Sequence, residues 1–229
     1  MKQNRHTLRA LALLLSYPDA RLREVLPALA DAIDAEGALP KARRAELRSL
    51  IDTLQRTDGL ELETGYVELF DRGRATSLHL FEHVHGNSRE RGPAMIDLTQ
   101  TYERAGLLLG PHELPDHLCV VLEFASTQPP AVAREFLGEM AHILNAIFSA
   151  LRKRESRYAS VLAAVLEMAG HKAEAVPVAD DAPLDESWAE PVAFDGCSSK
   201  GQTAADGTQP IHIVRTKPVV AFGAARQEA

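Results

Sequence analysis

Apolar side chains recur three and four positions apart along the first 170 residues. This spacing places them on one face of an α-helix, and no long segment alternates apolar and polar residues as a half-buried strand does. The connections between these stripes are short, which favours antiparallel neighbouring helices. The pattern predicts an all-α fold, a single multi-helix bundle over residues 1–170. The stripes lie near residues 8–15, 22–33, 47–54, 62–70, 77–85, 95–109, 114–125, 132–151 and 158–168.

The periodicity stops after Gly170. Residues 171–229 hold many of the prolines and glycines, and the stretch from Glu174 to Asp195 contains seven acidic residues and no basic one. Such a segment cannot bury enough apolar surface to order itself. We therefore expect a flexible, largely disordered acidic tail. Trp188 and an apolar segment near 209–216 could dock on the bundle or on a partner.

Charge and composition narrow the possible functions. The chain has 25 basic and 32 acidic residues, a net charge of −7, so we expect no nucleic-acid partner and favour a basic one. Cys119 and Cys197 provide no disulfide framework. No apolar stretch is long enough to span a membrane, so we expect no stable membrane insertion. The N-terminal apolar run is broken at 16–19, which is untypical of an export signal and indicates a cytoplasmic protein.

The densest group of chemically active side chains is the segment 77–85, which contains His79-x-x-Glu82-His83. On a continuous helix His79 and His83 would share a face, and two imidazoles so placed can bind zinc. A zinc site needs a third protein ligand, and no downstream residue stands out. The favoured interpretation is therefore a polar helix face whose side chains are hydrogen-bonded to their neighbours. The alternative is a small metal-dependent hydrolase that uses the His79/Glu82/His83 face.

A second group of charged residues lies around Pro115, which could occupy the first position of a helix. Asp116 would then lie in the first helical turn, where its charge offsets the helix dipole. Glu123 follows seven positions later on the same side and could border, with Asp116 and His117, a groove for a cationic ligand. No nucleophile motif or glycine-rich phosphate loop accompanies these residues, which disfavours both an enzyme and a nucleotide-regulated adaptor.

These segments together resemble a known family. The run from Tyr66 to Gly86, YVELFDRGRATSLHLFEHVHG, closely resembles the signature of the nitrate reductase delta-subunit chaperones, the NarJ/NarW family. Residues 14–19 and 88–98 are similar to that family as well. The resemblance covers roughly residues 5–170.

The sequence Pro115-Asp116-His117 also resembles part of the Glu-Pro-Asp-His motif of the wider TorD-like redox-enzyme maturation chaperones. Here Leu114 separates Glu113 from the proline, so only the Pro-Asp-His part and a later glutamate match.

The resemblance implies a TorD-like, all-helical cytoplasmic chaperone that is not an enzyme and holds no cofactor or metal. It would bind the apo form of the catalytic alpha subunit of respiratory nitrate reductase, including that subunit's basic N-terminal signal remnant. It would support molybdenum cofactor insertion and delay membrane docking. Molybdenum cofactor biosynthesis proteins would be further partners.

A basic amphipathic helix can bind in an apolar groove that has an acidic rim. We expect Tyr66, Leu69 and Phe70 to form the wall, although aromatic residues at helical spacing are more often core. We expect Asp116 and Glu123 to form the rim. The complete set of candidate peptide-binding residues is Tyr66, Leu69, Phe70, Asp71, Arg72, His79, Glu82, His83, Asp116, His117 and Glu123.

Overall fold

The structure is a computed structural model that describes residues 3–86 and 89–177, all within one compact unit. In these residues the chain forms ten α-helices and no β-strand, which confirms the all-α prediction. The rest of the expected tail, with Trp188 and the segment near 209–216, lies outside the described residues. No helix in 3–86 or 89–177 combines the length and apolarity needed to cross a membrane.

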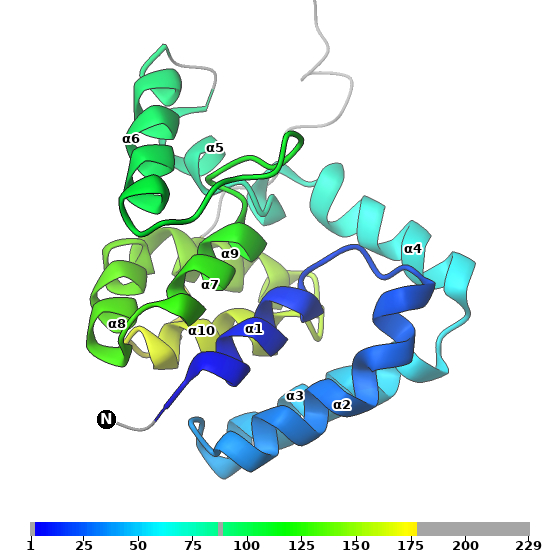
Figure 1. The fold of residues 1–229 in the computed structure, drawn as a ribbon. Helices are drawn as coiled ribbons and strands as arrows, with labels where there is room; N and C mark the ends of the chain where they lie inside the picture. Colours follow the sequence, from blue (N-terminus) through cyan, green and yellow to red (C-terminus); the bar gives the residue numbers. More distant parts are fainter. Residues whose placement is uncertain (1–2, 87–88, 178–229) are drawn as a thin grey trace, which may run out of the picture. The chain divides into compact units, whose positions relative to one another are not determined.

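The helices follow the predicted stripes closely, and Figure 1 shows their arrangement. Two short helical segments, η1 (Val67–Asp71) and η2 (Arg74–Thr76), join α4 to α5. The α-helices are α1 (Arg5–Leu14), α2 (Ala20–Glu36), α3 (Lys41–Arg56), α4 (Gly59–Tyr66), α5 (Leu80–His85), α6 (Arg91–Arg104), α7 (Leu118–Thr127), α8 (Pro130–Glu139), α9 (Ala141–Lys153) and α10 (Ala159–Met168).

Local sequence signals account for several helix ends. The Asp19 carboxylate accepts a 2.8 Å hydrogen bond from the Leu22 amide at the start of α2, and Asp58 accepts one of 3.0 Å from the Leu60 amide at the start of α4. Such capping satisfies amides that have no partner within the helix. Gly37 ends α2 in the left-handed conformation, at φ +59°, which glycine adopts without strain.

The core lies where α1, α7, α9 and α10 pack together (Figure 1). Helix α1 contacts α2, α7 and α10, and α9 packs along α10. Residues 161–166 of α10 are all buried, as expected of a helix that is covered on every side. Helices α2 and α3 pair with each other, and α3 reaches the core through α10.

The stripe at 132–151 is not one helix in the structure. It divides at Met140, which ends α8 and precedes α9 with φ −95° and ψ 3°. No proline or capping side chain marks this position, and the apolar spacing continues on both sides of it. The change of direction therefore depends on packing rather than on a local signal.

Residues 171–177, the described beginning of the expected tail, run along α9. The Glu174 amide donates a 2.9 Å hydrogen bond to Asn145 Oδ1, and the Val176 amide donates one of 2.9 Å to Ser149 Oγ. Ala173 packs against the core. This segment is therefore attached to the bundle although it has no regular secondary structure.

Gly73 lies in the tight connection between η1 and η2. A Cβ atom at this position would lie 2.7 Å from Arg154 Nη1, too close for a side chain to fit without rearrangement. Because Gly73 has no side chain, the Arg154 guanidinium group can pack directly against the backbone there. Only Gly73 of the Asp-Arg-Gly-Arg segment is buried, whereas Asp71, Arg72 and Arg74 are exposed.

Candidate functional site

The short helix expected at 77–85 begins only at Leu80, and His79 precedes it in an extended conformation. Residues 78–80 pair instead with residues 116–118. The Leu80 amide donates a 3.0 Å hydrogen bond to the Asp116 carbonyl, the Leu118 amide donates one of 2.9 Å to the Leu78 carbonyl, and an isolated antiparallel bridge joins His79 to His117. This long-range backbone pairing prevents the helix from starting earlier.

The prediction that His79 and His83 share one face of a helix is therefore wrong. No group of three or more potential ligand side chains that could hold a metal is found in the described part of the chain. His83 Nε2 lies 2.9 Å from the Ser77 carbonyl, and Ser77 Oγ donates a 2.6 Å hydrogen bond to Glu82. These contacts join residues within the segment 77–83. The helical face shared by His79 and His83, which the hydrolase alternative requires, does not form.

Asp116 is the centre of a buried polar cluster. Its side chain is fully buried, and Oδ2 accepts a 3.1 Å hydrogen bond from the Phe81 amide. His79 Nδ1 lies 3.5 Å from Oδ1, and Arg91 Nη2 lies 3.7 Å from Oδ2. Helix α7 begins at Leu118, so the prediction that Asp116 lies in the first helical turn is wrong.

Ionisation states in this cluster support one another. The interaction with the Asp116 carboxylate raises the pKa of His79, although partial burial opposes it. Burial acts to raise the pKa of Asp116, but His79, the Phe81 amide and Arg91 outweigh burial and lower it. Burial and the charge of His79 lower the pKa of the neighbouring His117. These shifts favour the charged forms of Asp116 and His79 and the neutral form of His117.

Glu123 is exposed on α7, whereas Asp116 is buried before that helix begins. The acidic rim expected from these two residues is therefore wrong. Asp71 and Arg72 are exposed at the end of η1. Partial burial raises the pKa of Glu123, and the nearby Glu113 acts in the same direction.

Tyr66 and Phe70 belong mainly to the core, where they form an aromatic cluster with Tyr17 and Tyr158. The Tyr66 and Phe70 ring centroids are 4.8 Å apart, and those of Phe70 and Tyr158 are 5.1 Å apart. Tyr66 donates a 2.7 Å hydrogen bond to the Leu15 carbonyl. Leu69 is only partly buried, so it is the member of the expected wall that is most open to a ligand.

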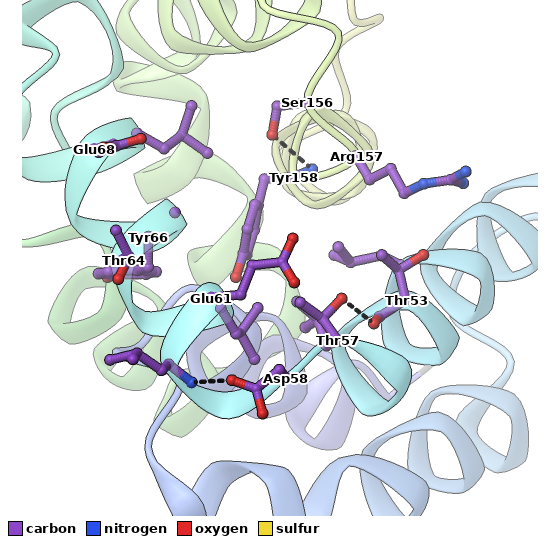
Figure 2. Close-up of a pocket in the computed structure, with 16 residues that line it drawn as sticks. Thr53, Thr57, Asp58, Glu61, Thr64, Tyr66, Glu68, Ser156, Arg157 and Tyr158 are labelled. Atoms are coloured by element: carbon purple, nitrogen blue, oxygen red, sulfur yellow. Dashed lines mark hydrogen bonds between the residues drawn. The ribbon is translucent and has the colours of Figure 1, made fainter.

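Tyr66 and Leu69 also line a large groove, the α3–α4 groove, between α3, α4 and the loop before α10. Its volume is about 790 Å³. Figure 2 shows this groove, with Glu61 directed towards the space between α4 and Tyr158. Leu60, which is 75% exposed, adds apolar surface to its edge. The remaining apolar lining consists of Leu50, Leu54, Leu62 and Tyr158.

The charged lining of the α3–α4 groove is mainly acidic. Asp58, Glu61 and Glu68 are exposed along it, against the single cation Arg157 among the described residues. In Figure 2 the Arg157 side chain extends away from Glu61 towards α3, where its Nη1 donates a 2.8 Å hydrogen bond to Ser49 Oγ. The groove thus offers an apolar floor and an acidic edge, supplied by residues other than the pair expected from the sequence.

Tyr158 lies at the floor of the groove with an unsatisfied hydroxyl group. Its side chain is buried, and its oxygen has no hydrogen-bond partner among the described residues. Burial raises its pKa, so the phenol is protonated and can donate. A buried hydroxyl without a partner is costly, and a polar group of a bound ligand could satisfy it.

The acidic residues of the groove had a signal in the sequence. Glu61 and Glu68 are seven positions apart, the spacing that drew attention to Asp116 and Glu123. Tyr158 had none, because it reaches the groove from a loop that is distant in sequence. The groove therefore becomes visible only when α3, α4 and this loop are placed together.

Comparison with known proteins identifies the family. The family described as nitrate reductase delta subunit matches residues 19–164. This chain belongs to that family. The match includes the Tyr66–Gly86 run, and it confirms the resemblance inferred from the sequence.

Two relatives from Escherichia coli K12 show how far the likeness extends. The chain is 42% identical over 205 residues to the nitrate reductase molybdenum cofactor assembly chaperone NarJ, covering 83% of this chain and 87% of NarJ. It is 40% identical over 165 residues to a protein named as the corresponding chaperone NarW, covering 71% of this chain and 68% of NarW. Both delta-subunit relatives are named as assembly chaperones rather than enzymes, which supports the prediction of a non-enzyme.

A solved structure supports the fold. The structure of a protein described as a redox enzyme maturation protein from Archaeoglobus fulgidus aligns with a TM-score of 0.50 at 23% identity. The alignment covers 71% of this chain and 91% of that chain. The helical bundle of this delta-subunit family member therefore has the same overall fold as that protein.

Proposed function

We propose that this chain is a cytoplasmic assembly chaperone for respiratory nitrate reductase. It binds the apo catalytic alpha subunit, supports insertion of the molybdenum cofactor, which is cargo and not a resident group of the chaperone, and delays membrane docking. The names of the delta-subunit relatives support the chaperone role. Contacts with proteins of molybdenum cofactor biosynthesis belong to the same proposal.

The α3–α4 groove is the observation that carries the proposal about client binding. We propose that it receives the basic N-terminal segment of the alpha subunit as an amphipathic helix. Leu60, Leu69 and Tyr158 would face the apolar side of that helix, and Glu61 and Glu68 would face its cations. In such a groove the apolar floor supplies most of the affinity, and the acidic edge supplies the preference for a basic peptide.

The candidate residues that lie outside the groove have other roles in this proposal. Asp116 contacts His79, the Phe81 amide and Arg91, and Glu82 also contacts Arg91, so we place these residues in a structural cluster and not in the peptide contact. His83 and His117 have partners in the same junction. The exposed Asp71, Arg72 and Glu123 are available to parts of the client other than its N-terminal segment.

The test is calorimetry of the client's N-terminal peptide against the full chain at low ionic strength. Reversing charge at the edge with Glu61→Lys/Glu68→Lys should lower affinity about tenfold, because two attractive contacts become repulsive. A matched control, Glu24→Lys/Asp31→Lys, changes the net charge equally on the exposed side of α2. This control should bind nearly as the wild type does.

Circular dichroism must show that both double variants keep their helix content. Equal affinity of wild type and groove variant would contradict the placement of the peptide in this groove. An equal loss in both variants would show that net charge, and not the groove, governs binding. Failure of the wild type to bind the peptide would contradict client binding through the N-terminal segment altogether.

A further inference from the structure

A second, smaller pocket lies where α3, α9 and the start of α10 meet, and its charge is opposite to that of the whole chain. The chain carries a net charge of −7, yet three arginines and one glutamate, Glu46, line this basic pocket. Its volume is about 370 Å³, within the range of small-molecule sites. Its cationic and hydroxyl lining consists of Arg43, Arg152, Arg157, Ser49, Ser156 and Ser160.

The three arginines differ in how they are neutralised. Arg43 is paired with Glu46 and also with Glu167, at 3.0 Å. Arg152 and Arg157 have no carboxylate partner at ion-pair distance within residues 3–86 and 89–177. Two exposed arginines therefore line the same pocket without an ion-pair partner in the part of the chain that the structure describes, because Glu46, the carboxylate of the lining, is paired with Arg43.

Local contacts orient these two guanidinium groups. Arg152 lies over the Phe148 ring, 5.9 Å from its centroid. Arg157 is directed towards α3 by its 2.8 Å hydrogen bond to Ser49 Oγ, the orientation seen in Figure 2. Holding a long side chain in one orientation before binding reduces the entropy lost when a ligand arrives.

We infer that the basic pocket binds the phosphate group of a small anion. The planar guanidinium group of arginine presents paired donors that match phosphate oxygens. The hydroxyl group of Ser49 accepts the hydrogen bond from Arg157 and keeps its own hydrogen, so it adds a neutral donor at the same wall. Ser160 Oγ donates to the Arg157 carbonyl. The pocket also includes the first residues of α10, whose amino end carries partial positive charge.

The size and lining favour a compact phosphate over an acidic protein segment. The pocket is less than half the volume of the α3–α4 groove, and its buried lining is limited to Phe148 and Ala159. An acidic peptide would need an extended basic surface, whereas the arginine side chains here line one small space. The inference goes beyond the proposed chaperone function, although the pocket shares Ser156 and Arg157 with the α3–α4 groove.

The test is calorimetry of inorganic pyrophosphate against the full chain at low ionic strength. The wild type should bind it saturably, and Arg152→Gln/Arg157→Gln should weaken binding at least tenfold. The control Arg56→Gln/Arg104→Gln removes the same charge from exposed positions on α3 and α6 outside the pocket and should bind as the wild type does. Circular dichroism confirms that both variants are folded.

Absence of saturable binding to the wild type would overturn the inference, as would equal binding by the two double variants. A short poly-glutamate peptide that binds with equal affinity and displaces pyrophosphate would overturn it in favour of an acidic protein partner. Titration of the basic client peptide with wild type is a separate measurement. Its failure would contradict the proposed client binding without affecting the outcome for pyrophosphate.

Discussion

Asp116 is a buried carboxylate that lies just before α7 and contacts a segment distant in the sequence. Its position in the Pro-Asp-His segment resembles a family motif, and the seven-residue spacing to Glu123 suggested a surface pair. The structure buries the carboxylate, where it accepts a hydrogen bond from the Phe81 amide. Burial depends on contacts with a segment 35 positions away, which no local pattern reports.

Replacing Asp116 should therefore affect stability more than peptide binding. Asp116→Asn removes the negative charge that faces His79 and Arg91, so these two side chains lose their shared buried carboxylate. We expect a loss of about 1–3 kcal/mol in the free energy of unfolding, the usual cost of leaving buried polar partners unsatisfied. Urea denaturation measures it, with the exposed Asp97→Asn as the control. Equal stability of the two variants would contradict a structural role for Asp116.

The pair formed by His79 and Asp116 should also give stability a particular pH dependence. The pKa of His79 is raised in the folded protein, so its contribution is fully present below the unfolded value of about 6.5. This contribution is lost as pH rises through the folded pKa. The destabilisation caused by His79→Gln should therefore be larger at pH 5.5 than at pH 8.5. Denaturation at both pH values measures this difference, and a difference of zero or opposite sign would contradict the pairing.

At the scale of elements, the sequence predicted helices well and their boundaries less well. The stripes for α1, α2, α3 and α10 lie on the observed helices, because apolar spacing reports burial directly. The start of α5 and the division at Met140 were missed. Backbone pairing with residues 116–118 sets the first, and packing against neighbouring helices sets the second, so neither leaves a local sequence signal.

The segment 171–177 should contribute measurably to the bundle. A chain ending at Gly170 loses the hydrogen bonds from Glu174 and Val176 to α9, each worth about 0.5–1.5 kcal/mol. A chain ending at Pro177 keeps them. We expect the shorter chain to unfold roughly 2–12 °C lower, as a protein of this size shifts about 2–4 °C per kcal/mol. Differential scanning calorimetry of the two chains tests this, and identical midpoints would show that the segment adds nothing.

At the scale of the molecule, the proposed client site combines apolar surface with acidic charge. The sequence predicted an apolar wall formed by Tyr66, Leu69 and Phe70. Tyr66 and Leu69 line the α3–α4 groove and Phe70 is in the core, and the carboxylates along this groove are Asp58, Glu61 and Glu68 instead of Asp116 and Glu123. The acidic edge of this groove and the basic pocket share Ser156 and Arg157, so surfaces of opposite preference adjoin on one side of the bundle.

The apolar and the charged contributions to peptide affinity should respond differently to salt. Leu60 is largely exposed, so Leu60→Ala removes apolar wall without opening the core. We expect this change to cost about 1–2 kcal/mol of peptide affinity, or roughly 5–30-fold, with little change between low and physiological salt. The exposed Val25→Ala on α2 is its control and should have no effect.

The loss caused by Glu61→Lys/Glu68→Lys should instead shrink as salt rises, because the Debye length falls from about 30 Å at 0.01 M to about 8 Å at 0.15 M. Calorimetry of the same peptide at these two ionic strengths separates the contributions. If the Leu60→Ala loss shrank with salt as strongly as the charge-reversal loss, the apolar wall would not be an independent source of affinity. The client would then be held mainly by charge, and the acidic edge would be the part of the groove that matters most.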